Sequence, residues 1–118
     1  MAQQGKWNAA IPQFERALQL NPDSAEAHNN LGLALAQQKK WDAAIAHYER
    51  ALQLNPDSAE THQNLGVALA AQGKLDEAMQ HFQQALKLAT AQNNPALAKA
   101  IRTQMKSYQS PSPLPHTP

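Results

Sequence analysis

The chain has 118 residues, a net charge of +1 and no cysteine. This length suffices for one domain with a modest core. The small net charge argues against a protein dedicated to nucleic acid or a membrane surface, and the lack of cysteine excludes disulfides and thiolate chemistry. No apolar run approaches the ~18 residues of a membrane span, and the first residues lack the apolar core of a signal peptide, so we expect a cytoplasmic protein.

A string of twelve residues occurs twice without a change. Residues 15–26 and residues 49–60, which begin 34 positions later, both read ERALQLNPDSAE. Over one full period, residues 5–38 and 39–72 are identical at 25 of 34 positions, and a third copy begins at Gly73. A fixed period of this length predicts a stack of helical hairpins.

Each period predicts two helices. The first helix has an apolar i, i+3, i+4, i+7 stripe that runs from His28 to Leu35. The second helix ends before Pro56, because proline disfavours helix in the residue that precedes it. Its apolar side is formed by Ala44, Ile45, Tyr48, Ala51, Leu52 and Leu54.

Acidic residues stand where the helices are expected to begin. Asp23, with Glu26 three residues later, predicts a capping box at the start of the first helix, and Asp57 repeats it one period on. Asp42 is the predicted cap of the second helix.

Two glycines lie inside predicted helices, at the same place in successive periods. Glycine there costs about 0.5–1 kcal/mol relative to alanine. We therefore expect close helix–helix approach at Gly32 and Gly66, with Ala44 and Ala78 opposite.

These residues resemble the tetratricopeptide repeat family. The resemblance covers about nine tenths of the chain, although His28 and His62 stand where the family usually has an aromatic residue. It implies an all-α, right-handed superhelical solenoid of antiparallel helix hairpins, with about six helices. The signature positions are filled by Leu31-Gly32, Ala44, Tyr48, Ala51 and Pro56, and again by Leu65-Gly66, Ala78, Phe82 and Ala85.

We expect the solenoid to occupy residues 1–108 and a Pro-rich, disordered tail to occupy residues 109–118. The expected divisions of the solenoid are a partial repeat 1–24, repeats 25–58 and 59–94, and a terminal helix 95–108.

The first repeat is expected to be incomplete. Residues 1–4 align with residues 35–38, which end a first helix, so Trp7–Leu20 becomes a second helix without its partner. Pro12 would then lie in the first turns, where it removes at most one backbone bond. We favour a fragment of a longer array over a face that meets another chain.

The resemblance also implies that the first helices line a concave groove. Asn30 and Asn64 are the sharpest candidates there, because an amide can pair with both the C=O and the N–H of an extended peptide. The alternative is that these amides bond within the repeats. The expected peptide-binding groove consists of Asn29, Asn30, Leu33, Gln37, Gln63, Asn64, Val67 and Ala71, with Lys99, Thr103 and Lys106 on the last helix.

Some relatives grip a C-terminal carboxylate with Lys and Asn on one helix and Lys and Arg on another. Here Asn29 and Leu33 fill the first pair of positions, and Lys99 and Arg102 are three residues apart, which is not the usual spacing. The resemblance therefore argues against an adaptor for chaperone tails. A weaker preference for an acidic peptide end near Lys99 and Lys106 stays open.

The histidines suggest a metal site, but their periodicity argues against one. His28 and His62 are one period apart, as are His47 and His81. Helices of successive repeats pack ~8–10 Å apart, whereas two ligands of one zinc ion each lie ~2.0–2.1 Å from it. We therefore expect packing roles for His28 and His62, polar outer positions for His47 and His81, and no metal or other cofactor.

No nucleophile-and-base pair and no glycine-rich phosphate loop is recognisable, so we expect no enzyme. The predicted function is a non-catalytic protein–protein interaction scaffold that binds a peptide or a partner helix in the concave groove, with no nucleic-acid or membrane partner. Two alternatives stay open: a self-assembling structural module that forms homo-oligomers through its unpaired N-terminal helix, and a regulatory or targeting fragment of a larger multi-repeat protein.

Overall fold

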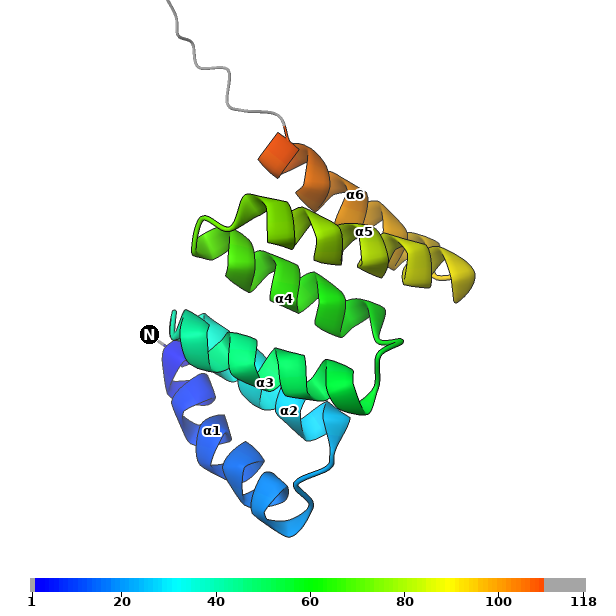
Figure 1. Cartoon of the computed structure of the whole chain (residues 1–118). Helices are drawn as coiled ribbons and strands as arrows, with labels where there is room; N and C mark the ends of the chain where they lie inside the picture. The colour runs from blue at the N-terminus through cyan, green and yellow to red at the C-terminus, as the bar shows by residue number, and fades with distance from the viewer. Residues whose placement is uncertain (1, 110–118) are drawn as a thin grey trace, which may run out of the picture.

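The computed structural model describes residues 2–109, with side chains from residue 5 onward. This part of the chain is all-α and consists of six helices packed as sequential antiparallel hairpins, which confirms the predicted class (Figure 1). Apart from its first residue, the predicted tail lies outside the described residues. The helices are α1 (Ala2–Leu20), α2 (Ala25–Gln37), α3 (Trp41–Leu54), α4 (Ala59–Ala71), α5 (Leu75–Ala91) and α6 (Pro95–Gln109).

Each helix packs against the next along the chain, and α2 also contacts α4 directly. The core is built largely from alanines, which let the helix axes approach closely, and from a few large side chains between them. None of the described helices combines the length and the apolar character that crossing a membrane requires. The largest fully buried side chains are Tyr48, Leu65, Phe82 and Ile101.

The two helical glycines mark close contacts, as predicted. A Cβ atom added at Gly32 would lie 2.7 Å from Cε1 of Tyr48, and one added at Gly66 would lie 2.9 Å from Cε1 of Phe82. The main contact is therefore an aromatic ring rather than an alanine side chain, although the carbonyl oxygen of Ala44 also lies 3.2 Å from the Gly32 position.

The expected start of the first helix at Trp7 is wrong, because α1 runs without a break from Ala2 to Leu20. In the later copies the residues equivalent to Gly5 form turns with positive φ, 63° at Lys39 and 81° at Gly73. Those turns fold the chain back onto the preceding helix, as the bond from Lys40 N to Leu35 O shows. Gly5, by contrast, lies inside α1 and is helical.

The predicted caps are also wrong. Ser24 and Ser58 are the N-cap residues, and their hydroxyl oxygens accept bonds from Ala27 N at 3.1 Å and Thr61 N at 3.2 Å. The backbone at both serines is extended, which is the conformation that an N-cap residue needs. The expected Asp42 cap is absent too: α3 begins after Lys40 without a side-chain cap, and Asp42 accepts a bond from Gln72 instead.

Candidate functional site: the side formed by α2, α4 and α6

The first helices of the hairpins meet along one side of the molecule. Besides the contact of α2 with α4, Gln63 of α4 donates a hydrogen bond of 2.8 Å to Oε1 of Gln104 on α6. Residues on this side come from all three helices, so they form one continuous surface. This surface is the candidate site.

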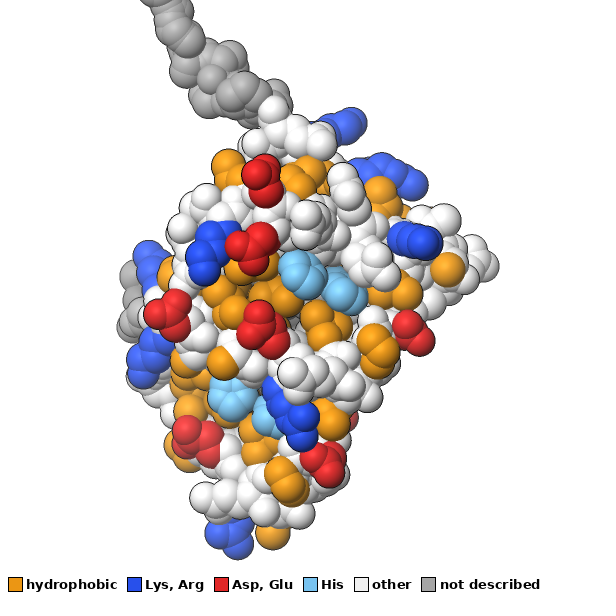
Figure 2. All heavy atoms as spheres, viewed as in Figure 1, with side chains coloured by type: hydrophobic (Ala, Val, Ile, Leu, Met, Phe, Trp, Pro, Cys, Tyr) orange, Lys and Arg blue, Asp and Glu red, His pale blue; other side chains and the backbone are white. Residues whose placement is uncertain are grey.

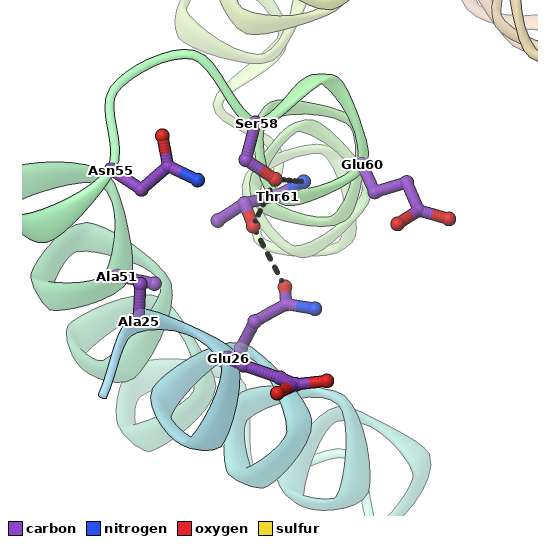
Figure 3. Close-up of a pocket in the computed structure, with 8 residues that line it drawn as sticks. Ala25, Glu26, Ala51, Asn55, Ser58, Glu60 and Thr61 are labelled. Carbon is purple, nitrogen blue, oxygen red and sulfur yellow. Dashed lines mark hydrogen bonds between the residues drawn. The ribbon is translucent and has the colours of Figure 1, made fainter.

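Asn29 joins α2 to α4 on this side. Its Oδ1 accepts a bond from Thr61 Oγ1 at 3.1 Å (Figure 3). It also accepts a bond from Asn64 Nδ2 at 3.2 Å. Two of the predicted groove residues, Asn29 and Asn64, are therefore bonded to each other. Asn30 is half-buried and makes no side-chain hydrogen bond within the described part of the chain.

A pocket of about 250 Å³ opens where α2 and α4 begin. In Figure 3 the carboxylates of Glu26 and Glu60 extend to the same side of it. The pocket offers an acidic edge and a polar wall. Its lining residues are Ala25, Glu26, Asn29, Ala51, Asn55, Ser58, Glu60 and Thr61.

The other predicted groove residues differ in exposure. Leu33 and Val67 are half-buried, whereas Gln37 and Ala71 are exposed. The three candidates of α6 are also exposed, and Thr103 Oγ1 donates to the backbone oxygen of Lys99 at 3.0 Å. Together with Arg102, Lys99 and Lys106 make α6 basic, opposite in charge to the edge formed by Glu26 and Glu60.

Four residues on this side were not among the predicted groove residues: Thr61, Gln104, Glu26 and Glu60. Thr61 is 2% exposed and replaces the Ala27 of the preceding copy, so the substitution within the repeat was the available signal. Gln104 lies beyond the third copy, where the period no longer assigns a position.

The histidines meet in pairs, but not one period apart. His28 faces His47 and His62 faces His81, each with an Nδ1–Nδ1 distance of 3.1 Å. Nε2 of His28 lies 2.9 Å from the backbone oxygen of Pro22, and Nε2 of His62 lies 3.2 Å from that of Pro56. The separation of 19 residues recurs in both copies.

Burial lowers the pKa of His47, His62 and His81, because the charged form is less well solvated there. The neighbouring histidine lowers the pKa of His47 and of His81 further. Glu15, Asp57 and Glu77 oppose these effects on His47, His62 and His81 respectively. Within residues 2–109, no three His, Cys, Asp or Glu side chains converge on a metal position.

Sequential hairpins whose first helices share one polar side define a helical repeat protein. Family models described as tetratricopeptide repeat match residues 2–59 and residues 35–105. The chain belongs to the tetratricopeptide repeat family. Comparison with the curated proteins gives no match.

Solved structures share this fold. A crystal structure of MamA is 32% identical with a TM-score of 0.70, over 75% of this chain and 52% of that chain. PcrH in complex with the chaperone binding region of PopD is 23% identical with a TM-score of 0.84, over 92% of this chain and 83% of that one. The TPR2B domain of yeast Sti1, solved in a complex with pHsp70, is 19% identical with a TM-score of 0.85, over 92% and 86%.

The chain spans about half the length of the MamA chains: the match covers 50%, 49% and 47% of three of them. At 23% and 19% identity, PcrH and the Sti1 domain show the fold alone.

Proposed function

We propose that this chain is a non-catalytic module that binds an extended peptide or a partner helix on the side formed by α2, α4 and α6. The observation that carries the proposal is the Asn29 junction, where half-buried amides lie beside a pocket of about 250 Å³. Concave sites with a few polar groups among apolar ones are typical ligand sites. The complexes of PcrH with a region of PopD and of the Sti1 domain with pHsp70 support this use of the fold.

The amides retain bonding capacity for a peptide backbone. Asn29 uses its oxygen twice within the protein, and Asn64 uses one N–H. We assign three groups to hydrogen bonds with the peptide backbone: the N–H groups of Asn29, the side-chain oxygen of Asn64 and the whole amide of Asn30. Leu33 and Val67 supply apolar contacts beside them.

The charges favour one orientation of the peptide. Glu26 and Glu60 edge the pocket at one end, while Lys99 and Lys106 lie exposed on α6. A peptide with a basic side chain near the pocket and an acidic end near α6 satisfies both. Exposed charges contribute chiefly to orientation and association rate.

The test starts from peptides selected from a random-peptide display library with the full chain. Replacing Asn30→Ala and Asn64→Ala together is expected to weaken the selected peptides at least ~10-fold, the loss of one or two hydrogen bonds. The matched control replaces Gln80→Ala and Gln83→Ala, which are exposed on α5. Equal peptide affinities for both double variants would place the site elsewhere.

One observation disfavours end-to-end assembly of copies through regular hairpins. Ile101 of α6 and Leu65 of α4 are both fully buried, so the two residues occupy equivalent positions in their helices. The next residue is Gly66 in α4 but Arg102 in α6. An incoming second helix needs that glycine, because an aromatic ring lies on it in both complete hairpins. Arg102 therefore blocks the α1 helix of another copy from pairing with α6 in this way.

A further inference from the structure

Each histidine pair brings two Nδ1 atoms to within 3.1 Å of each other. We propose that His62 and His81, assisted by Glu77, bind a divalent transition-metal ion such as Zn²⁺, and that His28 and His47 form a weaker counterpart. This proposal is independent of peptide binding.

The distance between the two nitrogen atoms fits one ion. Two nitrogens that each lie ~2.0–2.1 Å from a tetrahedral Zn²⁺ are ~3.3–3.4 Å apart. In the structure Nδ1 of His62 and Nδ1 of His81 are 3.1 Å apart, so the pair must open by only a few tenths of an ångström. The ring centroids are 5.3 Å apart, so the two Nδ1 atoms point at each other, and each ring must also turn until both lone pairs converge on one ion beside the line between the nitrogens.

The hydrogen bond behind His62 sets its tautomer. A carbonyl oxygen only accepts, so the proton of neutral His62 is on Nε2, which lies 3.2 Å from Pro56 O. Nδ1 of His62 therefore presents a lone pair, while His81 donates its Nδ1–H to it. On metal binding, the Nδ1 proton of His81 passes through solvent to Nε2 of the same ring, so no net proton is lost. A ligating histidine whose other nitrogen donates to a backbone carbonyl is the usual arrangement at metal sites.

The surrounding charges favour a cation at this pair. Burial lowers the pKa of His62 and of His81, which keeps both rings in the neutral, metal-binding form near neutral pH. The negative charge of Asp57 raises the pKa of His62, and that of Glu77 raises the pKa of His81. The same negative charges attract a metal cation to this pair. Neither carboxylate forms an ion pair among the described residues.

Glu77 is the best-placed additional ligand. It lies four residues before His81 on α5, so the two side chains share one face of the helix. Its carboxylate does not yet converge with the two rings, so it must rotate inward when the ion binds, with water completing the coordination. Two imidazoles and one carboxylate form a donor set that Zn²⁺ accepts.

The first pair provides an internal comparison. Two residues near the pairs differ between the copies. Ala43 of the first copy corresponds to Glu77, and Arg50, three residues after His47, corresponds to Gln84, three residues after His81. Arg50 also forms an ion pair with Asp23 at 3.2 Å, which neutralises the counterpart of Asp57. Figure 2 shows both histidine pairs on one face, with acidic side chains near both and a basic side chain against one of them.

The experiment is a calorimetric titration of the full chain with Zn²⁺ alone at pH 7.5, with the imidazole resonances followed by NMR. We expect the tighter site to lose at least ~10-fold in affinity in His62→Ala and a smaller factor in Glu77→Ala. His28→Ala and His116→Ala are the controls that leave the tighter site intact. Zn²⁺ should also raise the Tm of the parent chain, because the ion links α4 to α5, but not that of His81→Ala.

A gain-of-function variant keeps the test decisive if a histidine variant fails to fold. Ala43→Glu with Arg50→Gln gives the first pair the surroundings of the second, and we expect its Zn²⁺ affinity to rise toward that of the second pair. Zn²⁺ binding that is unchanged in both His62→Ala and Ala43→Glu/Arg50→Gln, or lost only in His116→Ala, would overturn the proposal.

Discussion

The ring of Tyr48 lies directly against the backbone of Gly32, so close that a Cβ atom there would be 2.7 Å from the ring. Tyr48 is 1% exposed and therefore has little room to move away. The same relationship joins Phe82 to Gly66. This contact fixes the first helix of each complete hairpin onto the second, and it explains why glycine is repeated inside a helix.

Gly32→Ala is expected to lower the free energy of unfolding by about 1–3 kcal/mol, because the added methyl group overpacks the contact with Tyr48. Gly5→Ala is the matched control: Gly5 is helical, and no atom of the described residues lies within 4 Å of its Cβ position. There alanine should stabilise by about 0.5–1 kcal/mol. Urea denaturation followed by circular dichroism measures both, and a stabilising Gly32→Ala would contradict the contact.

Pro12→Ala is expected to stabilise the chain by up to about 3 kcal/mol. Pro12 lies in the interior of α1, where it removes a backbone bond and its ring crowds the preceding turn. Ala46, one period later, shows that alanine suits this position. If α1 began at Trp7 instead, proline would lie near the helix start and the gain in unfolding free energy would be small.

Ser58→Ala should cost about 0.5–2 kcal/mol, because it removes the side-chain oxygen that accepts from Thr61 N. Asp57→Ala is the control and should change stability by less than about 0.5 kcal/mol. Thermal unfolding of both variants separates the two residues. A larger loss in Asp57→Ala would restore aspartate as the cap.

Asn29→Ala is expected to destabilise by about 1–3 kcal/mol, because it leaves Thr61 and Asn64 without their shared acceptor in a half-buried setting. Asn30→Ala breaks no hydrogen bond of the described structure and should leave the unfolding midpoint nearly unchanged. Comparing the two by chemical denaturation distinguishes an amide that holds the repeats together from one that is available to a ligand. Equal losses would show that Asn30 is also structural.

The stability of the chain is expected to fall as the pH is lowered from 7.5 to 5.5. The pKa values of His47, His62 and His81 lie below the ordinary 6.5 in the folded chain, so the unfolded chain binds more protons in this window. The stabilisation is fully present above pH 6.5 and is lost as the pH falls through the lowered values.

Unfolding free energies measured at several pH values check this expectation. His47→Gln with His81→Gln removes one titrating partner from each pair and should reduce the slope. A parent chain whose stability is flat between pH 7.5 and 5.5 would mean that the rings titrate alike in the folded and unfolded chain.

Much of the fold followed from the sequence because the period of 34 residues, the apolar stripes and the Asn-Pro stops are local signals. The end of α3 is an example: Pro56 disfavours helix at Asn55, and α3 ends at Leu54. The helical glycines were also interpreted correctly as close contacts. The caps were not predicted correctly: the sequence indicated Asp23, whereas Ser24 has the extended backbone of an N-cap residue and accepts from Ala27 N.

The candidate site was less predictable. Sequence placed Asn29, Asn64 and Gln63 on one side as separate groups, whereas the structure bonds the first two together and ties Gln63 to α6. These bonds join residues that are 41 and 35 positions apart in the sequence. Hydrogen bonds to such neighbours decide which donors and acceptors of a side chain stay available to a ligand.

The sequence by itself determined the class of fold, because a helical repeat is specified by contacts that recur within one period. Only the tertiary structure decided that Gly5 stays helical, that the histidines meet 19 residues apart, and that Tyr48 covers Gly32. The physical reason is the same in each case. Which atoms meet is set by how one helix lies across its neighbour, and a period along the chain does not contain that information.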